Sequence, residues 1–427
     1  MSAGICIMNK TAIALAADSA VTIGAHLAIH NSANKLFSLS RTAPIGVIVY
    51  ANAEFMNVPI ETIIKQYKRD LSTNTFSELN NYVDDFLAYL TKNATLFRFS
   101  LNEQAYVTAV YIDLLNGLFG DYQRMIKTKI DSVQRELTQE ELLQIQLEAT
   151  AATCHFVNGM EDIEGFDQTE YISAVYGNKI DEYISSCYSW VPTEIRPSLH
   201  DAVIAIYKKK FFRNGYVGIA FAGYGNKEIF GRMVHIHLSG VINGHIRFYT
   251  KEVVEISETQ SATITPLAQT DVMQTFLFGI NDNFISDLSK EIPLQIKSCL
   301  DGLDDSLFTP GKKEEVQSSL NSATSRIINQ VVSTAQSKYL FPITNSVATL
   351  PIEELSLLAE SMINITSLRR KVAIDDNNGT VGGPIDVAII SKGDGFIWLK
   401  RKHYFDQKYN PQYFYSHYLA EKEDKYE

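Results

Sequence analysis

Two short apolar runs at the beginning of the chain constrain the fold more than any other feature. Residues 3–8 (AGICIM) and 12–17 (AIALAA) are separated by a few residues that include the turn-like pair Asn9-Lys10. Short apolar runs without polar alternation are typical of strands that are buried on both faces. The sequence therefore predicts a buried hairpin here, and one acidic residue, Asp18, follows its second strand directly.

Strand and helix patterns alternate in blocks along the rest of the chain. Further strand patterns occur at 45–51, 215–255 and 385–399. Apolar residues at helical spacing occur over much of 78–210 and at 268–290, 312–338 and 351–367. The pair Asn243-Gly244 predicts a hairpin turn inside the second strand block. This order predicts an α+β or layered αββα domain that carries a helical insertion.

Composition and charge exclude several classes of function. The net charge of −11 argues against a nucleic-acid partner, because phosphate-binding surfaces need clustered Lys and Arg. The four cysteines are too scattered for a CxxC metal site, so we expect neither a metal nor another cofactor. No basic leader and no apolar run of about 18 residues is present, so we expect a cytoplasmic protein without a membrane partner.

The residues around the predicted hairpin form a recognisable series. In order, the series is Ser2, Ala16-Ala17-Asp18, Thr22 and Lys35-Leu36-Phe37. It resembles the proteasome β-subunit family of N-terminal-nucleophile hydrolases, in a divergent bacterial-type form. In that family the chain begins with a catalytic Thr or Ser on the first strand, and 45–70, 215–280 and 351–400 also resemble its strands and helices.

The resemblance implies a four-layer αββα sandwich with a large helical insertion. Its core would comprise 1–70, 215–284 and 346–403. The remaining parts would be a helical insertion at 71–214, a helical insertion or extension at 285–345 and a C-terminal tail at 404–427.

The resemblance also implies a catalytic mechanism. Ser2 would be the nucleophile once Met1 is removed, because its free α-amine has an ordinary pKa of about 7.7–8.0 and can act as the base. Lys35 would lower the pKa of the amine and of the hydroxyl, and Asp18 would keep Lys35 protonated and in position. The backbone N–H of Ala51 would bind the oxyanion, at a turn where the family usually has glycine.

Four further positions correspond to groups that support the N-terminal amine in the family. Thr270 and Asp271 offer a hydroxyl and a carboxylate near the start of the family's third helix. Asn378 and Thr380 lie near the supporting Asp and Ser before the last strand pair. A tight turn at Gly382-Gly383-Pro384 that only leads into a strand explains the second region equally well.

Two histidines and one cysteine are interpreted as structural. His235 and His237 alternate on one predicted strand without a carboxylate or a third ligand nearby in the sequence, so a metal site is not indicated. Cys6 lies inside the first strand and is expected to be an inert, buried thiol.

The leading functional expectation is a peptidase that cleaves amide bonds of peptide or protein substrates. The resemblance implies self-assembly into a homo-oligomer, and the helical insertion would cap the site or bind a partner such as an ATPase. Two alternatives stay open: a catalytically inactive assembly or sensing module with the same fold, and a small-amide acylase that uses the same nucleophile.

Overall fold

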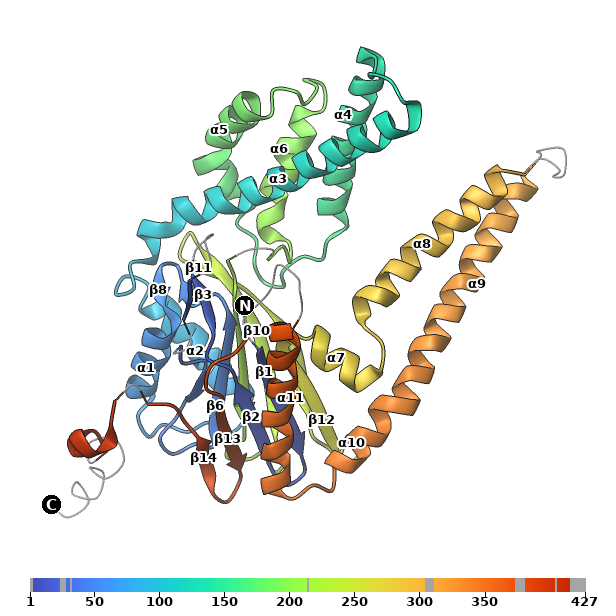
Figure 1. Cartoon of the computed structure of the whole chain (residues 1–427). Coiled ribbons are helices and arrows are strands. Elements are labelled where there is room, and N and C mark those ends of the chain that lie inside the picture. Colours follow the sequence, from blue (N-terminus) through green and yellow to red (C-terminus); the bar gives the residue numbers. More distant parts are fainter. Residues whose placement is uncertain are drawn as a thin grey trace.

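The computed structural model describes residues 3–23, 28–30, 33–212, 215–303, 311–372, 381–403 and 405–414. Two five-stranded antiparallel sheets form the centre of the molecule (Figure 1). In spatial order, the first sheet contains β12 (Ala262–Ala268), β1 (Ala3–Asn9), β2 (Ile13–Ala17), β13 (Asp386–Ser391) and β14 (Gly395–Lys400). The second sheet contains β11 (His245–Glu255), β10 (Arg232–Ile242), β9 (Val217–Gly223), β6 (Ile45–Ala51) and β5 (Leu36–Ser38). Together with the helices, these sheets confirm the predicted α+β class.

Short strands and many helices complete the described chain. The short pairs are β3 (Val21–Ile23) with β4 (Ala28–His30) and β7 (Glu54–Phe55) with β8 (Val58–Pro59). The helices are α1 (Ile60–Leu71), α2 (Leu79–Lys92), α3 (Phe99–Val133), α4 (Gln139–Gly159), α5 (Thr169–Cys187), α6 (Arg196–Ala205), α7 (Asp271–Phe278), α8 (Asp282–Asp301), α9 (Lys312–Ala335), α10 (Phe341–Val347), α11 (Ile352–Val372) and α12 (Pro411–Phe414). None of the helices in the described ranges combines the length and apolar character needed to cross a membrane.

The predicted N-terminal hairpin is confirmed, and every residue of β1 and β2 is buried. Asn9 closes its turn, because Oδ1 accepts hydrogen bonds from the backbone N–H groups of Thr11 (2.9 Å) and Ala12 (3.1 Å). β1 is hydrogen-bonded on both sides, to β2 and to β12, which explains why its sequence shows no polar alternation.

The side chains of β1 alternate between two apolar clusters. Ile5 and Ile7 pack with residues of α11 on the outer face of the first sheet. Cys6 and Met8 belong to a cluster that also contains Ile48 of β6, in the second sheet. The period of two along a strand therefore divides one apolar run between a helix-facing and a sheet-facing layer.

Helices α1 and α2 cover the other face of the second sheet. Val47 and Val49 of β6 share a cluster with Ile63 of α1 and Phe86 of α2. Helix α2 lies within 71–214 but packs on the sheet, whereas α3 to α6 form a separate helical bundle with its own apolar cluster. Figure 1 shows this bundle above one end of the sheets.

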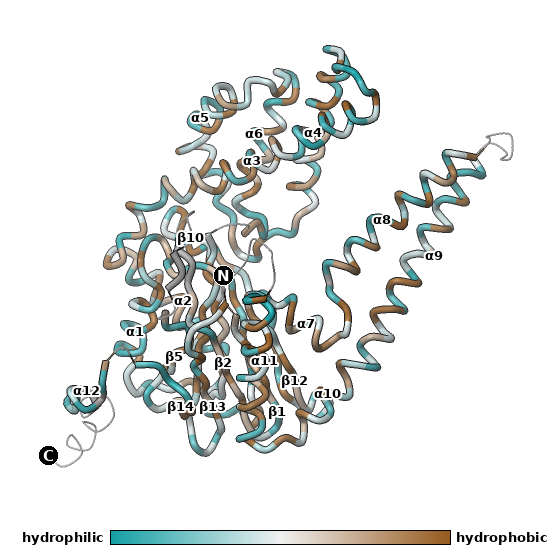
Figure 2. Tube along the Cα trace, viewed as in Figure 1, coloured by the Kyte–Doolittle hydropathy of each residue, from teal (hydrophilic) through white to brown (hydrophobic). Residues whose placement is uncertain are grey.

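The helical pattern at 268–290 is interrupted in the structure. Helix α7 ends at Gly279, which has a φ of 70° and therefore caps the helix in the left-handed conformation. Helix α8 then begins after Asn281 and pairs with α9 in a hairpin that projects away from the sheets (Figure 1). Apolar residues are spread along both of these helices (Figure 2). Phe284 and Ile327 are exposed.

Candidate active site

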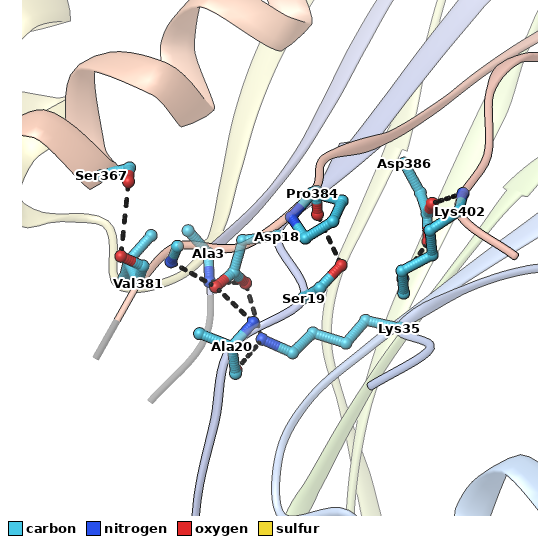
Figure 3. Close-up of polar contacts among 11 residues, drawn as sticks. Ala3, Asp18, Ser19, Ala20, Lys35, Ser367, Val381, Pro384, Asp386 and Lys402 are labelled. Atoms are coloured by element: carbon cyan, nitrogen blue, oxygen red, sulfur yellow. Dashed lines mark hydrogen bonds and ion pairs between the residues drawn. The ribbon is translucent and has the colours of Figure 1, made fainter. Parts of the chain in front are cut away.

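A buried ion pair joins the ends of two strands from different sheets. Asp18 directly follows β2, and Lys35 directly precedes β5. The Lys35 Nζ lies 2.6 Å from Asp18 Oδ1 and 2.5 Å from the carbonyl oxygen of Ala20 (Figure 3). Asp18 is 1% exposed and Lys35 is 5% exposed, so the pair is removed from solvent. A buried pair of this kind is retained only where further hydrogen bonds satisfy both charges.

The Asp18 carboxylate also fixes the start of β1. Its Oδ1 accepts a hydrogen bond from the N–H of Ala3 at 2.8 Å. Its Oδ2 accepts from the N–H groups of Ala20 and Gly382, both at 3.2 Å. Ser2 and Met1 lie outside the described residues, but Ala3 is covalently joined to Ser2, so the residue after the predicted nucleophile is held on this carboxylate.

The surroundings of the ion pair lower the pKa of Lys35. Burial lowers the pKa of the Lys35 ammonium, Asp18 opposes this effect, and the charge of Lys402 lowers the pKa further. Lys402 is itself paired with the buried Asp386, to which both its backbone N–H (2.9 Å) and its ammonium donate. A second acid–lysine pair therefore lies near the first, and no sequence pattern predicted it.

Residues 381–385, directly before β13, contact Asp18 and the residue after it. Besides the bond from its N–H to Asp18, Gly382 accepts a hydrogen bond from the N–H of Ser19 at 3.1 Å. The Ser19 hydroxyl donates to the Pro384 carbonyl at 2.5 Å (Figure 3). The turn noted in the sequence is thus in direct contact with the ion pair, whereas the predicted supporting residues Asn378 and Thr380 lie outside the described residues.

The turn after β6 has the backbone conformation that glycine favours. Ala51 has a φ of 68°, in the left-handed region, and the N–H of Asn52 donates to the Tyr216 carbonyl at 3.1 Å. Successive N–H groups along a strand point to opposite edges, and the N–H of Val49 donates to the Lys35 carbonyl at 2.8 Å. The N–H of Ala51 therefore points to the same edge of β6, the edge on which Lys35 lies.

Thr270 and Asp271 follow the strand that pairs with β1. Ala268 lies opposite Ala3, at the end of the paired stretch of β1 and β12. Asp271 accepts two hydrogen bonds of 2.7 Å from Arg370 of α11, and the Thr270 hydroxyl donates to Gln274. Within the part of the chain that the structure describes, no hydrogen bond joins either side chain to Asp18 or Lys35.

Cys6 and the potential metal ligands are not arranged for catalysis. Burial raises the pKa of the Cys6 thiol, which is fully enclosed and therefore poorly reactive. Among the described residues, no group of three or more His, Cys, Asp or Glu side chains is placed to hold a metal ion.

Comparison with known proteins gives similarity in structure alone. No family model matches the chain, and no curated protein matches it. The chain is similar in structure to Anbu proteins. A Gly-1 mutant of Anbu from Hyphomicrobium sp. strain MC1 is 10% identical with a TM-score of 0.30, over 96% of this chain and 91% of that chain. Anbu (ancestral beta-subunit) from Yersinia bercovieri is 9% identical with a TM-score of 0.28, over 97% of this chain and 94% of that chain.

A second structure of Anbu from Hyphomicrobium sp. strain MC1 is 11% identical with a TM-score of 0.27, and it covers 100% of this chain and 98% of that chain. The similarity thus extends over nearly the whole chain at low sequence identity. What individual residues do has to follow from the geometry of the site.

Proposed function

We propose that this protein is an N-terminal-nucleophile hydrolase that cleaves peptide bonds, with Ser2 as the nucleophile after removal of Met1. One observation carries the proposal. The N–H of Ala3, the residue after Ser2, is bonded to the same carboxylate that holds the buried Lys35 ammonium. Burying a lysine costs free energy, and buried ionisable groups with a charged partner occur often at functional sites, which supports a catalytic role for the pair.

The proposed fold is the four-layer αββα sandwich of this class of hydrolases. In its support, one apolar cluster contains residues of both sheets, and helices lie on the outer face of each. We assign 1–70, 215–284 and 346–403 to this core. We assign 71–214 to the helical insertion, whose first helix, α2, packs on the second sheet. We assign 285–345 to a second insertion or extension and 404–427 to a tail.

The reaction begins with the free α-amine of Ser2. The amine takes the hydroxyl proton while Oγ bonds to the carbonyl carbon of the substrate amide, and negative charge moves to the carbonyl oxygen. The N–H of Ala51 donates to this oxyanion. The C–N bond breaks as the ammonium returns its proton to the leaving nitrogen. Water then cleaves the resulting ester by the same route, which regenerates Ser2.

Lys35 and Asp18 tune this chemistry without taking part in bond formation. The Lys35 charge lowers the pKa of the neighbouring amine and hydroxyl, so that the amine is unprotonated near neutral pH. Asp18 holds the ammonium and the start of β1 with one carboxylate. We propose Thr270, Asp271, Asn378 and Thr380 as groups that support the N-terminal amine.

The substrate class, the assembly and the location that we propose follow from the resemblance of the sequence to the proteasome β-subunit family. The substrate is a peptide or protein, the assembly is a homo-oligomer, and the location is the cytoplasm. We propose that a protein partner such as an ATPase binds the bundle of α3 to α6, which has its own apolar core. No cofactor takes part in the proposed reaction.

A serine-directed covalent probe tests the proposal. We expect wild-type protein and the control Ser391→Ala to be labelled, and Ser2→Ala to be unlabelled. Ser391 is a suitable control because it is a buried serine near the other end of the first sheet, bonded to Asp394. A folded wild-type protein that is never labelled would favour the inactive assembly or sensing module. Labelling together with cleavage of small amides but not of peptides would favour the acylase.

A further inference from the structure

A buried chain of hydrogen bonds lies behind the Ala51 turn and takes no part in the reaction proposed above. At its centre the Tyr50 hydroxyl oxygen lies 2.6 Å from His235 Nε2 and 2.7 Å from His237 Nε2. All three side chains belong to the second sheet and are at most 5% exposed. The two Nε2 atoms therefore converge on the same hydroxyl oxygen.

The chain continues through the other nitrogen of each histidine. His235 Nδ1 lies 3.1 Å from Oε1 of Glu252, and His237 Nδ1 lies 2.9 Å from the Tyr249 hydroxyl. Glu252 and Tyr249 are both on β11 and are partly buried. One continuous series of hydrogen bonds therefore links five side chains, those of Glu252, His235, Tyr50, His237 and Tyr249.

The proton positions follow from the Glu252 carboxylate, which can only accept when ionised. His235 must donate from Nδ1, so its Nε2 accepts from the Tyr50 hydroxyl. The Tyr50 oxygen then accepts from Nε2 of His237, and Nδ1 of His237 accepts from Tyr249. Every buried donor and acceptor has one partner in this arrangement while both histidines are neutral.

The charge states required by this arrangement are those that the surroundings favour. Burial lowers the pKa of His235, and burial together with His235 lowers the pKa of His237 to about 3. The hydrogen bond from His235 lowers the pKa of Glu252. Both histidines are thus neutral and Glu252 is ionised near neutral pH.

The chain of hydrogen bonds is connected to both sides of the Ala51 turn. The carbonyl carbon of Tyr50 is covalently bonded to the nitrogen of Ala51, so fixing Tyr50 fixes one side of that peptide group. On the other side, the Tyr216 carbonyl accepts the hydrogen bond from Asn52, and the Tyr216 ring stacks on His237 with centroids 4.4 Å apart. His237 therefore contacts both residues that hold the turn.

Gly218 makes room for this arrangement. A Cβ atom at Gly218 would lie 2.2 Å from the Tyr50 ring, so the ring lies directly against the backbone of β9. The ring can approach so closely only because this position has no side chain.

We propose that Tyr50 is a positioning residue whose hydroxyl, held between His235 and His237, fixes the peptide group that presents the N–H of Ala51. This inference rests on the proposed function, in which that N–H binds the oxyanion. The left-handed φ of Ala51 is unfavourable for a residue with a side chain and needs such support from its surroundings.

The experiment compares Tyr50→Phe with Tyr67→Phe in the full chain. Tyr67 is a matched control, because it is also buried and donates through its hydroxyl to Asp85 at 2.8 Å, on the other side of the second sheet. Amide hydrogen exchange of 45–55 reports on the turn whether or not the protein is active. The maximal rate and the half-saturating concentration of labelling by the serine-directed probe report on chemistry and binding separately.

For Tyr50→Phe we expect exchange of the Asn52 amide to become about tenfold faster or more. We expect the maximal labelling rate to fall about tenfold to a hundredfold at an unchanged half-saturating concentration, because the oxyanion contact forms only in the transition state. Tyr67→Phe should change neither quantity. If Tyr50→Phe does not fold, Tyr249→Phe removes the terminal donor of the chain and should change both quantities in the same direction.

Unchanged exchange of 45–55 in Tyr50→Phe would overturn the inference, and so would faster exchange with an unchanged labelling rate. Wild-type protein that is never labelled would overturn the proposed function instead. In that case the exchange comparison alone decides whether Tyr50 positions the turn.

Discussion

The Lys35 ammonium lies 2.6 Å from the Asp18 carboxylate in the interior of the protein, between the ends of strands from two different sheets. Asp18 accepts hydrogen bonds from three backbone N–H groups in addition to this ion pair. One carboxylate therefore joins the start of β1, the end of β2, the segment before β13 and the start of β5.

Removing one partner of this pair should be strongly destabilising. We expect Asp18→Asn or Lys35→Met to lower the free energy of unfolding by about 3–5 kcal/mol, because each leaves a buried charge without its partner. The double variant should lose clearly less than the sum of the single losses. Unfolding in urea measures all three. The exposed pair of Lys312 and Glu315 is the control, where single changes should alter stability by about 1 kcal/mol or less. Strictly additive losses at Asp18 and Lys35 would contradict the coupling.

The N–H of Gly382 should contribute to the stability of the fold, whereas the absence of a side chain at this position should not. A Cβ atom there would meet nothing closer than the Ser367 hydroxyl at 3.8 Å, so Gly382→Ala should fold normally. Gly382→Pro removes the donor to Asp18 and should lower the free energy of unfolding by about 1–3 kcal/mol more than Gly382→Ala. Thermal and urea unfolding compare the two variants. Equal stability would show that this hydrogen bond does not contribute.

The resemblance predicted that Asp18 and Lys35 act together, and the strands next to them could be predicted because their apolar patterns are local. Asp18 and Lys35 lie next to strands whose apolar patterns are clear, and β1 and β2 are connected by a short turn. The contact from Gly382 to Asp18 spans 364 residues and depends on β13 pairing with β2. The Lys402–Asp386 pair forms within the β13–β14 hairpin, and the pairing of β13 with β2 places this hairpin beside the strand that ends at Asp18. No local pattern shows which distant strand completes a sheet.

The histidines illustrate a different limit of the sequence. Their alternation on β10 indicated that both face one side, and a structural role was expected. Their partner Tyr50 lies 185 residues from His235 on another strand, and only the register of β6, β9 and β10 brings these side chains together. The sequence therefore predicted a structural role for the histidines without showing which side chain they contact.

His237 should make stability depend on pH in the acid range. Its pKa is lowered from 6.5 to about 3, so between these values the unfolded chain binds more protons than the folded protein. Stability should therefore fall as the pH falls through this window, by up to about 1.4 kcal/mol per pH unit from this group. His237→Gln should show a smaller pH dependence over pH 3 to 6.5 than the wild type. Equal pH dependence in urea unfolding would contradict the neutral state assigned to His237.

Arg247 should be required to hold the helical bundle on the second sheet. It is fully buried between β11 and the chain after α6. Its guanidinium donates to the carbonyl oxygens of Ile206, Tyr207, Lys209 and Phe211 and to the hydroxyls of Tyr106 and Ser239.

Replacing Arg247 by Met removes the guanidinium donors from all four carbonyls, of which those of Ile206 and Lys209 still accept from backbone N–H groups. We expect a loss of about 3 kcal/mol or more in the free energy of unfolding. Faster proteolysis within 196–212 should accompany the loss. Arg124→Met is the control, since Arg124 is on the surface of α3 and its side chain is 77% exposed. Unchanged stability of Arg247→Met would contradict the structural role given to this residue.

The central claim is that a free N-terminal Ser2 beside Lys35 is the nucleophile. Peptide mass spectrometry of the intact protein after treatment with the serine-directed probe tests it most directly. The account predicts an N-terminal peptide that begins at Ser2, lacks Met1 and carries the probe on Ser2. An N-terminal peptide that retains Met1, or a probe found on a different residue while Ser2 is unmodified, would contradict it.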